Sequence, residues 1–185
     1  MSKVIIGLVG QIASGKDITK KYIIQKYGAE SVKFSQILRD ILIRLDVPAS
    51  RENISALSFS VRQIFGEDIF AKVITRDVKT FKSNIVVVDG VRRMEDIEFL
   101  KNLPEFSLVS VDALPEIRYQ RMKIRNENPG DAEKTFEEFL KQQLLETEMT
   151  IAGVMKEAQY QLTNNTTLED FKRDIDSLMV ELQEK

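Results

Sequence analysis

Residues 4–17 read Val-Ile-Ile-Gly-Leu-Val-Gly-Gln-Ile-Ala-Ser-Gly-Lys-Asp, and this stretch decides the fold. Its first six residues are a nearly unbroken apolar run, which predicts a strand buried on both faces of a sheet. Residues 10–17 match the pattern G-x-x-x-x-G-K-[ST] except at the last position, where Asp17 replaces the hydroxyl residue. A helical stripe follows, formed by Ile18, Tyr22, Ile23 and Tyr27. The sequence therefore supplies the strand, loop and helix in which this pattern binds phosphate.

The chemistry of phosphate binding explains the residue types of this loop. Glycine at positions 10 and 15 lets the backbone wrap closely around an anion, so that successive N–H groups point at phosphate oxygens. Lys16 adds a mobile positive charge, and the helix that starts near Gly15 directs its positive end to the same place. A glycine-rich turn that binds nothing is the alternative, and the position of Lys16 argues against it. We expect contacts with the phosphates of ATP from Gly10, Ala13, Ser14, Gly15, Lys16, Asp17 and Ile18.

Length and composition restrict the class of protein. A chain of 185 residues fits one domain with a substantial core. The net charge of -2 provides no basic excess for binding nucleic acid or a membrane surface. Cys and His are both absent, so carboxylates, Lys and Arg must carry any chemistry. No apolar run approaches the ~20 residues of a membrane span, and no signal peptide is recognisable. We expect a cytoplasmic protein, a monomer or homodimer, whose partners are small molecules.

Strands and helices are predicted to alternate along the chain. This order predicts an α/β fold with a five-stranded parallel sheet, wound right-handedly, and helices on both faces. The expected strands are residues 4–9, 30–34, 84–89, 106–111 and 160–163.

Three successive helices are predicted between the second and third strands, which is more than a single crossover connection contains. We interpret residues 35–80 as an inserted helical subdomain, whose first helix Ser35 would cap. Farther along the chain, residues 132–158 predict one long amphipathic helix.

Asp89 ends the third strand, at the edge of the sheet where ligands of parallel sheets bind. We expect Asp17 and Asp89 to hold Mg²⁺ through water, because a carboxylate near a triphosphate needs a cation to offset its charge. The alternatives are a turn residue for Asp89 and, for Asp17, a helix N-terminal acid. Gly90, and not Glu, follows Asp89, and no N-K-x-D stretch is present. This pattern favours transfer to a bound acceptor over hydrolysis or guanine binding.

Arginines that follow the second, third and fourth strands are candidates for binding an acceptor phosphate. The guanidinium group binds two phosphate oxygens at once. Arg118, Arg121 and Arg125 have the spacing i, i+3, i+7 of one helical face. For each arginine, the alternative is a solvated surface charge that binds no ligand. For Arg93 and Arg125, the position in the sequence favours phosphate binding over this alternative. Arg62, in the inserted helices, remains open between the two interpretations.

Four segments together resemble nucleoside-monophosphate kinases and, more narrowly, the adenylate-kinase-related P-loop proteins of archaea. These segments are residues 7–16, 34–39, 89–93 and 111–116, followed by Arg121 and Arg125. The resemblance implies the three-layer P-loop NTPase fold, ATP as phosphoryl donor and Mg²⁺ as cofactor. It implies a lid at residues 121–134 and catalytic roles for Lys16, Arg93, Arg121 and Arg125. It also implies that Arg39 and Arg93 hold the acceptor monophosphate, and Arg62 and Arg92 are further candidates for acceptor binding from their positions in the sequence.

The tail at residues 160–165 resembles the segment before the last helix of dephospho-CoA kinases, which lies near the adenine of ATP. The resemblance makes Asn164 and Asn165 candidates for adenine contact. Ser35 and Gln36 stand where those kinases carry an Asp-containing stretch. This difference weakens the interpretation of the chain as a dephospho-CoA kinase. We therefore favour a kinase of nucleoside or deoxynucleoside monophosphates. The alternatives are dephospho-CoA kinase and a regulator that binds AMP or ATP with little turnover.

Overall fold

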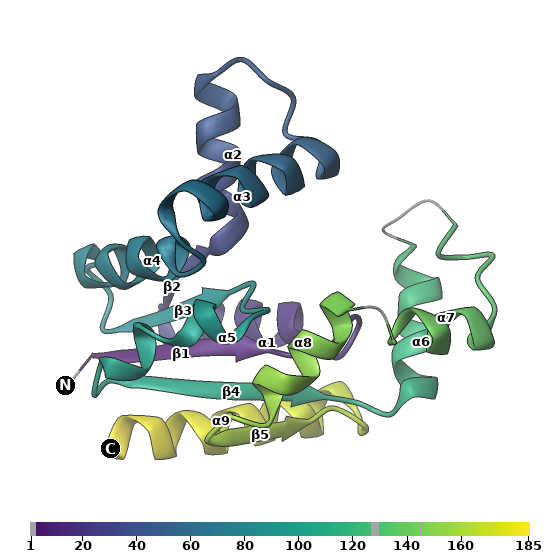
Figure 1. Ribbon diagram of the computed structural model, residues 1–185. Helices are drawn as coiled ribbons and strands as arrows, with labels where there is room; N and C mark the ends of the chain where they lie inside the picture. Colours follow the sequence, from purple (N-terminus) through teal and green to yellow (C-terminus); the bar gives the residue numbers. More distant parts are fainter. Residues whose placement is uncertain (1–2, 127–129, 145) are drawn as a thin grey trace.

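The computed structural model describes residues 3–126, 130–144 and 146–185, and these form a three-layer α/β structure (Figure 1). Five parallel strands lie in the order β2-β3-β1-β4-β5. The central strand β1 (Val4–Val9) pairs with β3 (Ile85–Asp89) and β4 (Phe106–Asp112), while β2 (Glu30–Lys33) and β5 (Tyr160–Thr163) are the edges. The predicted parallel sheet is confirmed.

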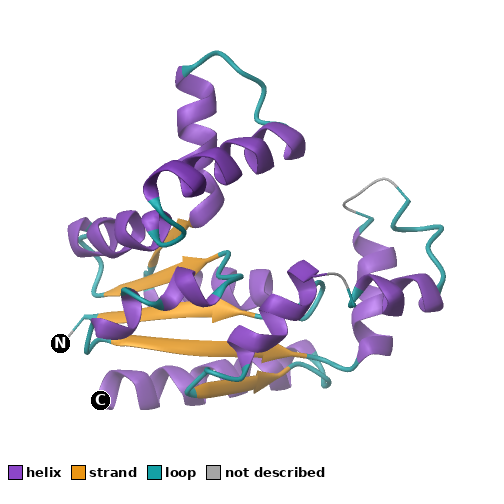
Figure 2. Ribbon diagram, viewed as in Figure 1, coloured by secondary structure: helices purple, strands orange, loops and turns teal. Residues whose placement is uncertain are grey.

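The apolar run of β1 is buried on both sides because each face of the sheet is covered by helices (Figure 2). Ile6 and Leu8 pack against α1 (Lys16–Tyr27) and α9 (Leu168–Glu184). Ile5 and Val9 belong to the cluster on the opposite face, which includes residues of α4 (Ile69–Thr80), α5 (Met94–Ile97) and α8 (Glu146–Met155). Because the sheet is buried between two layers of helices and all its strands are parallel, the carboxyl ends of the strands lie together at one edge.

Two helices between β2 and β3 project away from the sheet, and the third rests on it (Figure 1). α2 (Phe34–Arg44) and α3 (Arg51–Phe65) form the projecting pair, whereas Phe70, Ile74 and Val78 of α4 are buried in the core. The predicted cap at Ser35 is wrong, because α2 begins at Phe34 and its N-cap is Lys33, two residues before Ser35. Burial of Phe34 in the core cluster places the start of the helix directly at the end of β2.

The single long helix predicted for residues 132–158 is also wrong. The structure has α7 (Phe136–Gln142) and α8 in this part of the chain, after α6 (Pro115–Arg125) and a turn. A capping box starts α7, in which Thr135 Oγ1 accepts from the N–H of Glu138 and the Glu138 carboxylate accepts from the N–H of Thr135. The capping box therefore starts a separate helix within the range that was predicted to be one helix. A 3-10 turn, η1 (Leu100–Asn102), precedes β4.

No helix in the described part of the chain is long and apolar enough to cross a membrane.

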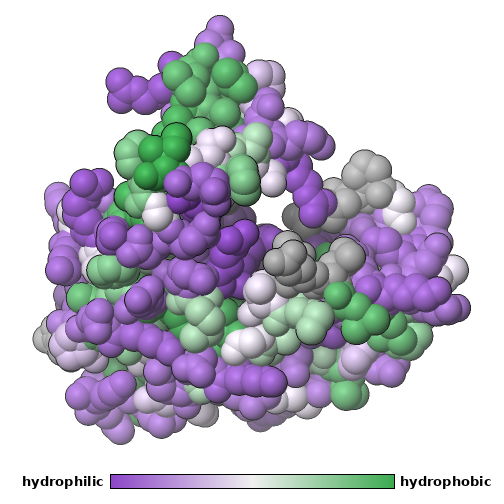
Figure 3. All heavy atoms as spheres, in the orientation of Figure 1, coloured by the Kyte–Doolittle hydropathy of each residue, from purple (hydrophilic) through white to green (hydrophobic). Residues whose placement is uncertain are grey.

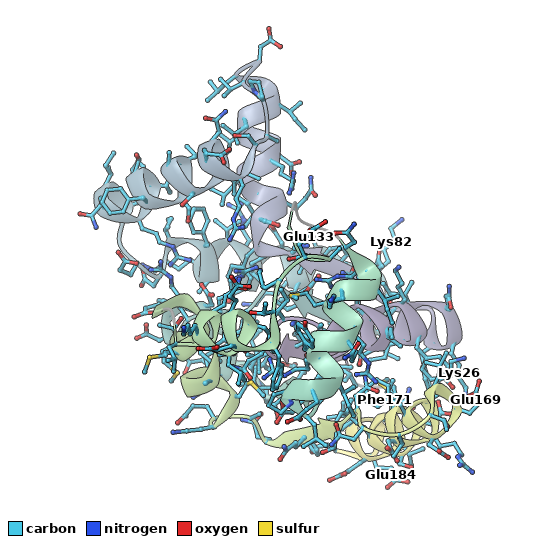
Figure 4. All side chains as sticks on the ribbon, turned by 90° about the vertical axis from the view of Figure 1, so that its right-hand side faces the viewer. Lys26, Lys82, Glu133, Glu169, Phe171 and Glu184 are labelled. Carbon is cyan, nitrogen blue, oxygen red and sulfur yellow. The ribbon has the colours of Figure 1, made fainter. Side chains whose placement is uncertain are left out.

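Asp176 connects α9 to α1, the helix that follows the phosphate loop. Its carboxylate accepts hydrogen bonds from Tyr22 at 3.0 Å, Tyr27 at 2.7 Å and Lys26 at 2.7 Å. Burial opposes ionisation, but the hydrogen bonds outweigh it and hold the pKa of Asp176 below its usual value. Burial and the bond to Asp176 raise the pKa of Tyr27 to about 12. Figure 4 shows Lys26 near the helix that carries Phe171 and Glu169.

We predict that Asp176→Asn lowers the free energy of unfolding at pH 7 by ~1–2 kcal/mol, a figure reduced for partial exposure. The folded-state pKa of Asp176 is depressed, so its stabilisation is present above the ordinary Asp pKa of about 3.9 and is lost as pH falls through the folded value. Urea unfolding at pH 7 and near pH 3 measures both effects. Asp174→Asn, an exposed change on the same helix, is the control and should change stability by less than ~0.5 kcal/mol. Equal effects of the two substitutions would contradict the assignment.

Candidate nucleotide-binding site

The loop between β1 and α1 has the backbone shape of an anion-binding turn. Ala13 and Gly15 have left-handed backbone, with φ of 59° and 116°. A Cβ at Gly10 would lie 2.2 Å from the carbonyl oxygen of Val111, so only glycine fits against β4. Gly15 is the N-cap of α1 and has no side chain with which to cap the helix, so the first N–H groups of α1 suit a ligand. The predicted phosphate loop therefore has the required geometry.

Lys16 lies folded over this loop. Its ammonium donates to the carbonyl oxygens of Gly10 at 2.5 Å and Gln11 at 3.0 Å. These contacts hold the positive charge beside the N-terminus of α1. Ser14 is fully buried, and its Oγ has no hydrogen-bond partner among the described residues.

Asn164, in the turn after β5, connects the phosphate loop to α6. Its Nδ2 donates to the carbonyl oxygen of Ser14 at 2.9 Å, and its Oδ1 accepts from Arg121 at 3.1 Å. The residue is 3% exposed, and its backbone N–H donates to Asp112 at 2.8 Å. Its side chain is therefore directed at the loop. The neighbouring Asn165 accepts from the N–H of Leu114 at 2.8 Å, so both predicted adenine contacts make bonds within the protein.

Arg121 is the arginine that the structure places beside the phosphate loop. One guanidinium nitrogen is bound by Asn164, and the other terminal nitrogen is buried without a partner among the described residues. Burial lowers the pKa of Arg121 from its usual value. A buried N–H group without a protein acceptor is costly, and an anionic ligand would satisfy it. The geometry thus suits a phosphoryl group held between Arg121 and the loop.

A single ammonium group joins the two carboxylates that were predicted to bind Mg²⁺. Lys20 Nζ lies 2.5 Å from Asp89 Oδ2 and 3.6 Å from Asp17 Oδ1. Burial alone would lower the pKa of Lys20, but its hydrogen bond to Asp89 and the charges of both carboxylates outweigh burial and raise it. Mg²⁺ is bound in nucleotide sites by one or two carboxylates, waters and substrate phosphates. Two carboxylates that one cation can reach fit that chemistry.

Arg125 stands on the other side of Asp17, with 3.8 Å between Arg125 Nη1 and Asp17 Oδ2. Arg118, which shares the predicted helical face, is instead buried. Its guanidinium donates to Ala113 at 3.0 Å and to Gln143 at 2.8 Å. It also lies over the ring of Phe139. Of the three arginines with the i, i+3, i+7 spacing, Arg118 therefore packs inside the protein, whereas Arg121 and Arg125 lie near the phosphate loop.

The predicted acceptor arginines differ in their surroundings. Arg39 is exposed and lies 3.5 Å from the carbonyl oxygen of Ala49, and Arg93 is half exposed and 3.2 Å from Glu67. Arg62 is buried, pairs with Asp96 at 2.9 Å and lies over the ring of Phe70.

Asp96 also accepts from the backbone N–H groups of Arg92 and Arg93, at 2.9 and 3.0 Å. Through Asp96, Arg62 thus braces the segment that carries Arg92 and Arg93. Arg92 contributes its backbone to this arrangement, and its side chain is exposed.

A hollow of about 340 Å³ lies beside the end of β2. Its lining joins polar groups of α1, β2, β3 and α2, namely Lys20, Ser31, Lys33, Gln36 and Asp89, with Val32 and Phe81. In the space-filling view, an opening separates the projecting helices α2 and α3 from the region of α6 and α7 (Figure 3).

Sequence reasoning missed Lys20 and the bracing role of Asn164. Lys20 stands three residues after Asp17, which on a helix places the two side chains on the same face. That spacing could have been noticed, whereas its contact with Asp89 depends on the register of β3.

We predict that Asn164→Ala weakens ATP binding by roughly tenfold, because it removes two hydrogen bonds that fix Ser14 and Arg121. Titration of ATP by calorimetry measures the change. Asn165→Ala, which leaves the phosphate loop untouched, is the matched control and should change affinity less than threefold. An equal or larger loss in Asn165→Ala would favour the alternative role of these residues in adenine contact.

Comparison with known proteins defines the family. No protein-family model matches this chain. A UPF0200 protein of Thermococcus kodakarensis is 30% identical over 187 residues, covering 98% of this chain and 99% of the relative. A UPF0200 protein of Pyrococcus abyssi is 32% identical over 181 residues, covering 95% of each.

Solved structures show the fold. Shikimate kinase from Bacteroides thetaiotaomicron has a TM-score of 0.63 at 17% identity, covering 97% of this chain and 98% of that one. Shikimate kinase from Acinetobacter baumannii, in complex with shikimate, has a TM-score of 0.55 at 16% identity, covering 99% and 96%. The predicted fold class, a three-layer P-loop NTPase fold with a five-stranded parallel sheet, is confirmed. By sequence, the chain belongs to the UPF0200 family.

Proposed function

We propose that this protein is an ATP- and Mg²⁺-dependent phosphotransferase whose acceptor is a nucleoside or deoxynucleoside monophosphate. The observation that carries the proposal is the link from Ser14 through Asn164 to Arg121. It holds, beside the loop, an arginine with a buried N–H group that has no acceptor within the described part of the chain. The kinase fold of the structural neighbours supports phosphoryl transfer in general.

On the donor side, the loop binds the phosphates of ATP. The N–H groups at the start of α1 and the ammonium of Lys16 contact phosphate oxygens, and Lys16 exchanges its bonds to Gly10 and Gln11 for bonds to the ligand. Arg121 and Arg125 approach from α6 and neutralise charge on the transferring group. Mg²⁺, when bound, supplies charge neutralisation of the phosphates, and Asp17 and Asp89 are the residues that would hold it.

On the acceptor side, Arg39 and Arg93 bind the monophosphate. Both guanidinium groups are accessible, and a phosphate can replace the contacts that Arg39 makes with Ala49 and Arg93 makes with Glu67. Arg62 acts indirectly by bracing Asp96, which differs from the direct acceptor contact for which its position made it a candidate. Closure of α2 and α3 toward α6 would exclude water and bring donor and acceptor in line.

A phosphate acceptor suits the carboxylates of this site better than a hydroxyl acceptor does. A hydroxyl group needs a general base, whereas a phosphate is already a nucleophile. Asp89, at the end of β3, is neutralised by Lys20 at 2.5 Å. Asp112, at the end of β4, accepts from the N–H of Ala113 at 2.8 Å. Both carboxylates already have a partner within the protein, and a phosphate acceptor needs neither of them as a base, which favours it over the hydroxyl acceptor of a dephospho-CoA kinase.

An assay of ADP release tests the proposal. ATP and Mg²⁺ are supplied with a panel of acceptors: ribo- and deoxyribonucleoside monophosphates, dephospho-CoA and shikimate. We predict that a monophosphate stimulates ADP release and that Lys16→Ala lowers the stimulated rate on the order of 10²-fold or more, because it removes a charge that acts on the transferring group. Circular dichroism checks that this variant is folded.

Three other outcomes would contradict the proposal. Stimulation by dephospho-CoA or shikimate alone would assign a hydroxyl acceptor. ATP binding without stimulation by any acceptor would indicate a nucleotide-binding regulator. Normal turnover in Lys16→Ala would remove the donor site from the loop.

A further inference from the structure

Asp17 creates an electrostatic conflict in the phosphate loop. The pattern places a neutral hydroxyl at this position, where it faces the metal-bound phosphates. Asp17 instead brings a full negative charge to the first turn of α1, with a side chain that is 58% exposed. A second carboxylate, Asp89, is only 7% exposed and lies on the same side of the loop. A triphosphate that enters this site is therefore repelled unless cations compensate, and any positive charge that the protein supplies lessens what Mg²⁺ must provide.

Lys20 is the cation that the structure supplies. Its side chain is 19% exposed, and its ammonium contacts both carboxylates, at 2.5 Å from Asp89 and 3.6 Å from Asp17. The other basic groups are placed less well. Arg125 and Lys33 each reach a single one of these carboxylates, at 3.8 Å and 4.0 Å, and both are more exposed. Lys16 bonds to carbonyl groups of the loop.

We propose that Lys20 is a built-in counter-cation that makes the Asp17 form of the loop able to bind nucleotide. It neutralises Asp17 toward the phosphates and fixes the carboxylate of Asp89 at the end of β3. Lys20 is thus a positioning residue, which acts through the two carboxylates. The inference rests on the proposed binding of nucleotide by the loop.

The proposal makes Asp17 and Lys20 a matched pair. With a hydroxyl at position 17 the repulsion disappears, so loss of Lys20 should then matter much less. With Asp17 present, loss of Lys20 leaves two uncompensated carboxylates, and Mg²⁺ must supply more of the positive charge. The effect of Lys20 on nucleotide binding should therefore depend both on residue 17 and on Mg²⁺ concentration.

A double-mutant cycle tests this pairing. The variants are Lys20→Met, Asp17→Ser and the two combined, each checked by circular dichroism, and the probe is a fluorescent ATP analogue titrated at several Mg²⁺ concentrations. We expect Lys20→Met to weaken binding about tenfold and to raise the Mg²⁺ concentration needed for half-maximal binding. In the Asp17→Ser background the same change should weaken binding less than about threefold. Lys20→Arg, which keeps the charge, should retain most of the affinity.

Lys21→Met is the matched control, because Lys21 is the next residue of α1 and is exposed. It removes the same charge away from the carboxylates and should leave binding and the Mg²⁺ requirement unchanged. Equal losses from Lys20→Met in both backgrounds, or no loss in either, would overturn the pairing while leaving the proposed function intact. Failure of the wild-type protein to bind the analogue would overturn the proposed function, and the inference with it.

Discussion

The side-chain amide of Asn164 holds together the segments from which the candidate site is built. It accepts from Arg121 of α6 and donates to Ser14 of the phosphate loop, while its backbone is bonded to the end of β4. The packing is so close that a Cβ at Gly15 would lie 2.1 Å from the Asn164 amide nitrogen. The left-handed turn at Gly15 and the position of Arg121 therefore depend on one buried residue in the turn between β5 and α9. A site assembled in this way needs little reorganisation when an anion binds.

Charge is distributed over this framework in two groups. Lys16 and Arg121 lie at the loop, and Lys20 lies between the carboxylates of Asp17 and Asp89. On the proposed acceptor side, the buried pair of Arg62 and Asp96 fixes the backbone of the segment that carries Arg93. Breaking such a buried pair leaves one charge unpaired, so the pair maintains the geometry of the segment. Both sides thus combine accessible cations for ligands with buried polar contacts that set their positions.

The parts of this structure that follow local rules could be predicted from the sequence. The β1 run, the loop and α1 were recognised because their periodicity and glycine spacing are local properties of the chain. The start of α2 was misplaced because burial of Phe34, a tertiary contact, decided it rather than the capping tendency of Ser35. The capping box at Thr135 was overlooked within an amphipathic pattern that continues beyond it. The contacts of Lys20 and Asn164 join residues that are far apart in the chain, with separations of 69 and 150 positions, and depend on strand order.

The proposed function requires that the nucleotide is recognised through its phosphates, at the loop between β1 and α1. Displacement of a bound fluorescent ATP analogue, in the presence of Mg²⁺, tests it most directly when inorganic tripolyphosphate and adenosine are compared as competitors. If the loop provides the affinity, tripolyphosphate displaces the analogue at concentrations at which adenosine has no effect. Displacement by adenosine, with no displacement by tripolyphosphate, would place recognition at the base and contradict the account.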